Sequence, residues 1–217
     1  MSRSRSAALA ALTALFVAAA VGVTVAKEPP APATPTVVRA YHDSGQWAKD
    51  TKAAFAKATK ALQKSVAKKV KRATLVMDID DTSLSTYDCA SPGDFTSAAT
   101  ATCIIGAKLP VIPQALALAK YAVKKKVKLV FITARPQSIE ALTRANLALA
   151  KYPKYTLVMK PVTTEPVASS AYKTAARKAL VDGGARIVLS VGDQQSDLVG
   201  GFAGTTVKIP NPMYLNK

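Results

Sequence analysis

The sequence predicts an α/β fold in which a parallel sheet carries helices on both faces. Short apolar runs of strand length alternate with helix-length segments through most of the chain. This alternation is typical of parallel strands joined by right-handed crossover helices. Acidic side chains directly follow two of the apolar runs, at Asp78 and Asp193. Because ligands of such sheets bind beyond the carboxyl ends of the strands, we expect a site where these two runs end.

The N-terminal segment has the features of a secretory signal peptide. Arg3 and Arg5 precede an apolar stretch over residues 7–25, and residues 24–26 offer a cleavage site. Residues 1–26 are therefore predicted to be a signal peptide that is removed on export. An uncleaved membrane anchor is the alternative, since roughly 19 apolar residues can just span a bilayer. We expect a secreted or extracytoplasmic protein.

The segment after the leader is predicted to be a linker that ends where the folded domain begins. Residues 27–45 begin with a run rich in proline, which favours an extended spacer. One domain is expected over residues 46–217, because the chain is long enough for a single sizeable core. Its first helix is indicated by apolar residues at steps of three or four from Trp47 to Val70, and a buried strand over residues 74–79 follows.

Residues 83–108 are predicted to form an insertion over the end of this first strand. They show little apolar periodicity and contain prolines and glycines together with both cysteines of the chain. In a secreted protein Cys89 and Cys103 can form a disulfide, which would close a loop of about 15 residues and contribute roughly 3 kcal/mol. Two free thiols in a mobile segment are the alternative.

The rest of the domain is predicted to alternate helices and strands to its end. The expected elements are helix 110–126, strand 127–133, helix 136–150, strand 155–159, helix 168–182, strand 186–191 and strand 205–209. Pro136 suits the first turn of a helix. Gly183 and Gly184 indicate the end of the helix before them.

The chain is strongly basic, with a formal charge of +17 that falls to +15 when the two arginines of the leader are removed. This balance favours anionic partners such as phosphate esters or an anionic cell envelope. Much of the charge is carried by lysines of predicted helices, namely Lys57, Lys60, Lys64, Lys68, Lys69, Lys120, Lys124, Lys125 and Lys126. A solvated helix face is the alternative explanation. Aromatic residues are few and lie apart from these runs, so no specific nucleic-acid binding is expected. The sequence indicates no oligomeric state.

The scarcity of histidine and of suitably spaced cysteine and arginine residues argues against several catalytic mechanisms. His42 is the single histidine of the chain, which argues against a histidine nucleophile, a histidine-rich metal centre or a Ser-His-Asp site. A phosphatase with a cysteine nucleophile needs an arginine six residues after the cysteine, and Phe95 and Leu109 occupy those positions here. What remains is carboxylate chemistry with a hard cation.

The acids at the strand ends predict a magnesium site with a carboxylate nucleophile. Mg²⁺ prefers oxygen ligands, and Asp78, Asp193 and the backbone carbonyl of Asp80 can each supply one. Asp78 can also attack phosphorus and form an acyl phosphate. Asp80, two residues later, can protonate the leaving alcohol and then deprotonate water.

Donors for the transferring phosphoryl group are also expected at this edge. The hydroxyl of Thr133 and the backbone N–H of Ala134 end a buried strand and can hold phosphate oxygens. A lysine is needed as well, and Lys173, early on a predicted helix, competes for this role with Lys160 at a strand end.

These motifs, in this order, resemble the haloacid dehalogenase (HAD) superfamily of phosphohydrolases. The matching segments are Asp78-Ile-Asp80-Asp81-Thr82, Thr133-Ala-Arg135, Tyr172-Lys173, Gly192-Asp193-Gln-Gln-Ser-Asp197-Leu and the late Lys-Ile-Pro-Asn-Pro-Met-Tyr214. Within the superfamily the chain is similar to the secreted acid phosphatase branch, subfamily IIIB, which includes plant acid phosphatases and vegetative storage proteins. The resemblance covers about Trp47 to Tyr214.

The resemblance implies a Rossmann-like fold and a Mg²⁺-dependent acid phosphatase that hydrolyses small organic phosphate esters through an aspartyl-phosphate. It maps the nucleophile to Asp78 and the acid/base to Asp80. It assigns phosphate binding to the side chains of Thr133 and Lys173. It places Asp193 and Asp197 at the metal and makes residues 83–108 a cap insertion. Arg135 is expected to contact substrate, with a helix-entry or surface position as the alternative, and Asp81 is expected to be a structural partner.

Three other functions compete with this one. A non-catalytic storage or anionic-ligand-binding protein could use the same scaffold, but the presence of Asp78 argues against it. A metal-dependent glycosyltransferase could use Asp78 and Asp80 to hold a nucleotide diphosphate, but Lys173 and the second acidic cluster would have no role. A basic module that binds the envelope or nucleic acid is supported by charge alone.

Overall fold

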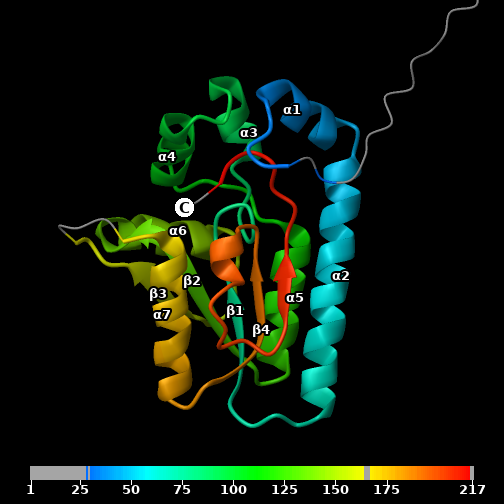
Figure 1. Cartoon of the computed structure of the whole chain (residues 1–217), viewed down its shortest axis with the longest axis vertical. Coiled ribbons are helices and arrows are strands. Elements are labelled where there is room, and N and C mark those ends of the chain that lie inside the picture. The colour runs from blue at the N-terminus through cyan, green and yellow to red at the C-terminus, as the bar shows by residue number, and fades with distance from the viewer. Residues whose placement is uncertain (1–27, 29, 164–166, 216–217) are drawn as a thin grey trace, which may run out of the picture.

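The computed structural model describes residues 28, 30–163 and 167–215. The predicted signal peptide lies outside the described residues. Five parallel strands form one sheet in the order β3-β2-β1-β4-β5 (Figure 1). They are β1 (Ala73–Met77), β2 (Lys128–Pro136), β3 (Thr156–Lys160), β4 (Arg186–Gly192) and β5 (Thr206–Lys208). The predicted parallel α/β fold is confirmed.

Helices cover both faces of the sheet because its central strands are apolar on both sides. On one face α2 (Gln46–Ala67) and α5 (Pro113–Lys124) pack together over strand residues that include Leu75, Met77 and Phe131. The helix α6 (Glu140–Leu149) adds Leu147 to this core. On the other face α7 (Ser169–Asp182) covers a smaller core with Val76, Val130, Ile132 and Ile187. Successive side chains of β1 therefore point into different cores, as the pleat of a strand requires.

Element boundaries differ from the predicted ones by a few residues. β2 continues to Pro136, so Ala134 and Arg135 belong to the strand rather than to the loop after it. A short 3-10 turn (Gln137–Ile139) then precedes α6, which starts at Glu140 instead of Pro136. A register shift between β2 and β3 after Thr133 accommodates this extension.

The predicted linker over residues 27–45 is wrong for its second half, which contains helix α1 (Pro35–Asp43). Val38 and Tyr41 lie three residues apart and are buried together on one face of this helix. Pro35 occupies the first helical position, where its missing N–H costs nothing. The proline-rich composition therefore marks the start of a packed helix rather than a spacer.

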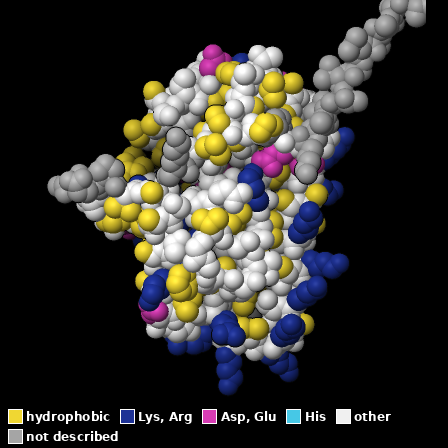
Figure 2. Space-filling model, viewed as in Figure 1, with side chains coloured by type: hydrophobic (Ala, Val, Ile, Leu, Met, Phe, Trp, Pro, Cys, Tyr) yellow, Lys and Arg dark blue, Asp and Glu magenta, His cyan; other side chains and the backbone are white. Residues whose placement is uncertain are grey.

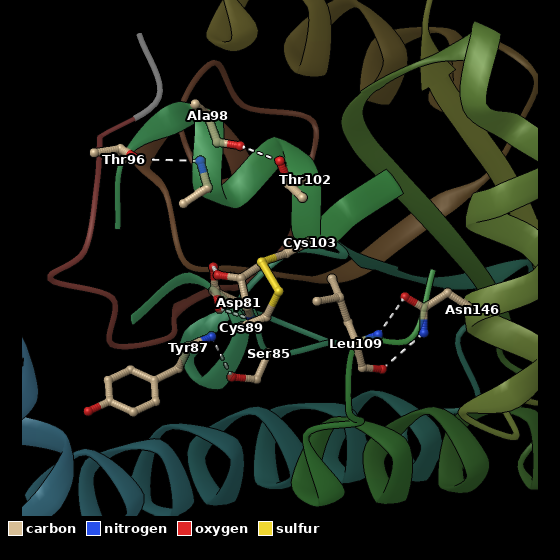
Figure 3. The surroundings of a disulfide bond; sticks show 12 residues. Asp81, Ser85, Tyr87, Cys89, Thr96, Ala98, Thr102, Cys103, Leu109 and Asn146 are labelled. Atoms are coloured by element: carbon tan, nitrogen blue, oxygen red, sulfur yellow. Dashed lines mark hydrogen bonds between the residues drawn. A yellow bond between two sulfur atoms is a disulfide. The ribbon is translucent and has the colours of Figure 1, made fainter. Parts of the chain in front are cut away.

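The segment 83–108 folds into short helices that lie at the carboxyl end of the sheet (Figure 1). These are α3 (Tyr87–Ala90), a 3-10 turn (Ser91–Gly93) and α4 (Ser97–Ile105). Cys89 and Cys103 form a disulfide that joins α3 to α4 (Figure 3), with 5.9 Å between their Cα atoms. The predicted disulfide is confirmed, and Tyr87 and Phe95 anchor the segment in the main core.

Reduction of this disulfide is expected to lower the free energy of unfolding by about 3 kcal/mol, because the bond links residues 14 apart and restricts the unfolded chain. Chemical denaturation with and without reductant measures the difference. The double variant Cys89→Ser/Cys103→Ser is the matched control and should not respond to reductant. An equal response of both proteins would contradict the prediction.

No helix among residues 28–215, as far as they are described, is both long enough and apolar enough to cross a bilayer.

Candidate active site

Folding brings three aspartates from two distant segments into one cluster. Asp78 directly follows β1 and Asp193 directly follows β4, its neighbour in the sheet. Asp197 lies in the 3-10 turn after β4 (Gln195–Asp197). Each of the three offers one carboxylate oxygen, these oxygens lie within 4.8 Å of one another, and all three residues are buried.

This cluster fits a divalent cation. Among the described side chains, one positive group, the ammonium of Lys173, is in direct contact with these three carboxylates. Buried carboxylates are costly unless positive charge compensates them. Asp78 Oδ1 accepts no hydrogen bond within the described structure, although Lys173 Nζ pairs with it as an ion at 3.0 Å. An oxygen-only donor set of this kind suits a hard cation such as Mg²⁺.

Lys173, rather than Lys160, reaches the cluster. It projects from α7 and is almost fully buried. Its Nζ donates a 2.5 Å hydrogen bond to Asp197 Oδ1 and lies 3.0 Å from Asp78 Oδ1. Burial lowers the pKa of Lys173, but the charges of Asp78 and Asp197 outweigh it and hold the pKa above its ordinary value. Lys160 instead donates to the backbone carbonyl of Val167.

Burial is also the largest influence on the pKa values of the aspartates at this site. It raises the pKa of Asp78 well above the ordinary value; Lys173 acts in the opposite direction, and the neighbouring carboxylates add to the rise. The pKa of Asp197 is raised by burial too. Burial raises the pKa of Asp81 to about 7, with a further contribution from Asp193. Without a cation, the folded site therefore holds protons that the unfolded chain would release.

Removal of divalent cations is expected to make stability fall as pH rises from about 4, the ordinary range for aspartate, to about 7, the raised pKa of Asp81. In this window the folded state binds more protons than the unfolded state, so the free energy of unfolding decreases with pH. A bound cation replaces those protons. Added Mg²⁺ should therefore raise the melting temperature of chelator-treated protein more at pH 8 than at pH 5, measured by thermal denaturation at constant ionic strength. An equal gain at both pH values would contradict this account.

Three polar side chains with no role predicted from the sequence donate hydrogen bonds to Asp193. Thr82 Oγ1 donates to Asp193 Oδ1 at 2.8 Å, and Asn211 Nδ2 donates to Oδ2 at 2.8 Å. Gln194 Nε2 donates to the same Oδ2 at 2.7 Å. Such partners fix the orientation of a metal-binding carboxylate. Their place in the sequence could have pointed to them, since Thr82, Gln194 and Asn211 all lie within the motifs that carry the resemblance.

Asp197 is positioned by a glycine and a buried arginine. A Cβ at Gly192 would lie 2.2 Å from the side chain of Asp197, so only glycine permits this close approach. Arg177 of α7 is fully buried and donates to the backbone carbonyls of Asp197 and Val199. It thereby fixes the loop after β4. Nothing in the sequence distinguishes Arg177 from the other cations of the predicted helices.

The side chain of Asp80 is not part of the three-acid cluster. Its carboxylate accepts hydrogen bonds from Arg135, with Nη2 to Oδ1 at 2.7 Å and Nε to Oδ2 at 3.0 Å. Arg135 also donates to Thr143 Oγ1 at 3.3 Å and is 3 % exposed. Arg135 therefore holds Asp80 in place, and a metal role for Asp80 is left to its backbone carbonyl.

Thr133 and Ala134 lie where the sequence places them, at the carboxyl end of β2. Thr133 is buried, and its Oγ1 accepts a hydrogen bond from the backbone N–H of Arg135 at 3.1 Å. Ala134 is not among the residues with positive φ, so its side chain causes no backbone strain. Asp81 accepts from Thr86 and from the Tyr214 hydroxyl, which agrees with a structural role.

A cavity of about 400 Å³ adjoins Asp80 and Arg135 and has the insertion as one wall. Its other lining residues are mostly apolar and include Phe95, Ala101, Ile104, Ile105, Pro136, Ile139 and Tyr214. His42 lies outside this cavity and stacks against Tyr87 and Trp47. Its placement agrees with a structural rather than a catalytic role.

Fold and site together define a class: a Rossmann-like α/β protein with a buried acidic cluster that could hold a divalent cation at the carboxyl edge of its sheet. A family model described as HAD superfamily, subfamily IIIB (acid phosphatase) matches residues 3–217, so the chain belongs to this family. The resemblance inferred from the motifs is confirmed.

Several plant proteins are similar to about half of the chain. The stem 28 kDa glycoprotein of Glycine max is 38% identical over 109 residues, which cover 48% of this chain and 43% of that protein. Vegetative storage protein 2 of Arabidopsis thaliana is 34% identical over 50% of this chain and 41% of its own length. Acid phosphatase 1 of Solanum lycopersicum is 32% identical over 48% and 42%. The match thus spans less than half of each relative.

The same fold occurs in a solved structure, the class C acid phosphatase from Bacillus anthracis. The two superpose with a TM-score of 0.70 over 83% of this chain and 85% of that one, at 19% sequence identity. At this identity the likeness concerns the fold alone.

Proposed function

We propose that the chain is a Mg²⁺-dependent phosphomonoesterase that works through an aspartyl-phosphate on Asp78. The observation that carries this proposal is the buried contact of Asp78 with Lys173, beside Asp193 and Asp197. An isolated strand-end carboxylate would need none of these neighbours, whereas a nucleophile that meets a phosphate dianion needs compensating positive charge. Family membership supports the same reaction class.

In the proposed reaction Asp78 attacks phosphorus while the bond from phosphorus to the leaving alcohol breaks. Asp80 in its acid form gives its proton to the departing oxygen. Water then attacks phosphorus, Asp80 accepts its proton, and the bond between phosphorus and the Asp78 oxygen breaks to restore the carboxylate. Thr133, the N–H of Ala134 and Lys173 bind phosphate oxygens. A cation held by Asp78, Asp193, Asp197 and the Asp80 carbonyl supplies electrostatic stabilisation of the transferred group.

Hydrolysis of a chromogenic phosphomonoester by the purified chain tests this function. Activity should require added Mg²⁺ and should disappear with a chelator. Wild-type protein that stays inert across a panel of phosphoesters would favour the alternative, a non-catalytic storage or anionic-ligand-binding protein on the same scaffold, which the names of some relatives also suggest.

The lining of the cavity suggests the kind of ester. Among the described residues that line it, Arg135 is the only cation, and Asp80 already neutralises that charge. Phe95, Ile104, Ile105 and Tyr214 offer apolar and aromatic surface next to the proposed acid. We therefore infer that the substrate is the phosphate ester of an uncharged apolar alcohol rather than a sugar phosphate or a nucleotide.

The variant Ile105→Ser is expected to lower kcat/KM for aryl phosphates about tenfold, because loss of apolar contact in a pocket costs roughly 1–3 kcal/mol per methylene-sized group. The kcat/KM of a phosphoester with a small polar alcohol should change little. Leu149→Ser, at another exposed apolar residue that does not line the cavity, is the matched control. Equal losses for both substrate types would contradict this role for Ile105.

We further propose that residues 46–217 form the catalytic domain, against whose core α1 also packs, that residues 83–108 act as its cap, and that residues 1–26 are removed when the chain is exported. The position of α4 beside the cavity supports the cap assignment. N-terminal sequencing of the exported protein tests cleavage, since a first residue near Lys27 is expected.

A further inference from the structure

The charge of this protein is distributed unequally between the two edges of its sheet. The carboxyl edge carries the aspartates of the candidate active site. By contrast, the sequence contains no Asp or Glu from Thr51 to Met77, or from Phe95 to Ile139. These two stretches include nearly all of α2 and all of α5, which pack side by side on the same face of the sheet.

Exposed lysines form a continuous track on this acid-free surface. Lys57, Lys60, Lys64 and Lys68 recur at steps of three or four and therefore share one side of α2. At 1.5 Å per residue they extend over roughly 16 Å. Figure 2 shows Lys and Arg side chains projecting along this side and from the base of the molecule. We define these four residues as the α2 track.

The track continues across the amino edge of the sheet. The exposed residues there are Lys69, Lys71, Arg72, Lys124, Lys125, Lys126, Lys128 and Arg186. Strand pairing places Thr74 beside Lys128, and Ala73 beside Arg186, so cations from different parts of the chain become neighbours. Favourable interaction with helix C-termini explains one or two lysines at the end of each helix. It does not explain Lys57 and Lys60, which lie further back along α2.

We infer that the α2 track and the adjoining amino edge bind a linear phosphate polymer without bases. The cations follow a line along α2 and then turn across the base, a shape that a flexible chain can follow but a flat bilayer cannot. Lysines are point charges without the planar fork that reads base edges. Among the described residues, none of the exposed large hydrophobic side chains lies on α2, on α5 or in the turns after them, so this surface offers no apolar anchor for a membrane.

This binding surface lies at the opposite edge of the sheet from the proposed active site. A polymer bound there leaves the cavity beside Asp80 open. The protein can therefore be retained on a polyanion while it acts on small substrates. The inference does not depend on the proposed reaction, because it rests on the surface charge alone.

Fluorescence anisotropy with labelled inorganic polyphosphate of about 100 units tests the inference on the full chain. Binding is expected at about 0.1 M NaCl. The triple variant Lys57→Gln/Lys60→Gln/Lys64→Gln should weaken it at least tenfold and lower the slope of log affinity against log salt by two to three, roughly one per lost phosphate contact. The control Lys108→Gln/Arg144→Gln/Lys178→Gln removes the same net charge from other surfaces and should change affinity less than threefold.

Three results would overturn the inference. One is equal weakening by both triple variants, which would mean that net charge alone controls binding. Another is tighter binding to anionic vesicles, or to duplex DNA of equal charge, than to polyphosphate. The third is competition between polyphosphate and a small phosphate ester for hydrolysis, since that would place the polymer in the active site rather than on the α2 track.

Discussion

Asp78→Asn is expected to abolish hydrolysis of phosphomonoesters, with a loss of at least about 10⁴-fold in kcat, a scale typical of removing a catalytic nucleophile. The amide has nearly the same shape as the carboxylate but cannot form the acyl phosphate. We expect the variant to remain folded, because Lys173 keeps its contact with Asp197 and burial already disfavours the charge of Asp78. Initial rates with a chromogenic ester, together with circular dichroism, measure both quantities.

Asp182→Asn is the matched control for this variant. Asp182 is an exposed carboxylate on α7 that pairs with Lys178, and its loss should leave activity unchanged. If Asp78→Asn kept more than about a tenth of the wild-type activity, Asp78 would not be the nucleophile. If the wild-type protein were itself inert, the storage or binding alternative would replace the enzymatic one.

Lys173→Met is expected to lower the free energy of unfolding by about 3–5 kcal/mol in the absence of divalent cations. The substitution leaves the buried carboxylates of Asp78 and Asp197 without their shared ammonium group, and an uncompensated buried charge carries a cost of this size. Chemical denaturation in the presence of a chelator measures the change. Methionine fills a similar volume, so the effect reports charge rather than a cavity.

The pH dependence separates this electrostatic effect from simple loss of packing. Without Lys173 the pKa values of Asp78 and Asp197 should rise further, so that more protons bind to the folded state. The destabilisation should then be smaller at pH 5 than at pH 8, and added Mg²⁺ should recover part of it. Lys178→Met, on the same helix but exposed and paired only with Asp182, should change stability by less than about 1 kcal/mol. A loss that is equal at both pH values and insensitive to Mg²⁺ would contradict the electrostatic account.

Much of the fold followed from local sequence patterns. The five strands and their parallel direction could be predicted because apolar runs of strand length alternate with amphipathic helices. The helix α1 was missed because prolines dominate the composition around it, although Val38 and Tyr41 carry the apolar spacing of one buried helix face. The helices of residues 83–108 were missed for a related reason: α3 spans four residues, too few to show a period.

The candidate site was predictable in its acids and less so in its supporting residues. Asp78 and Asp193 stand out because carboxylates that directly follow buried strands have no place in an apolar core. Arg177 does not stand out, since an arginine on a basic helix is common on any surface, and Asn211 is marked only by its place in the late Lys-Ile-Pro-Asn-Pro-Met-Tyr214 motif. Their importance follows from burial beside Asp197 and Asp193, which only the folded chain reveals.

Local sequence is enough to locate the ends of the strands and the side chains that stand there, because strand polarity and apolar periodicity are properties of neighbouring residues. The pairing of these side chains with distant groups arises only in the folded chain. There Lys173 rather than Lys160 contacts the acids, Arg135 pairs with Asp80 across 55 residues, and Thr82 donates to Asp193 across 111. Such contacts depend on strand order and on the rotation of packed helices, which the whole core fixes at once and no short segment encodes.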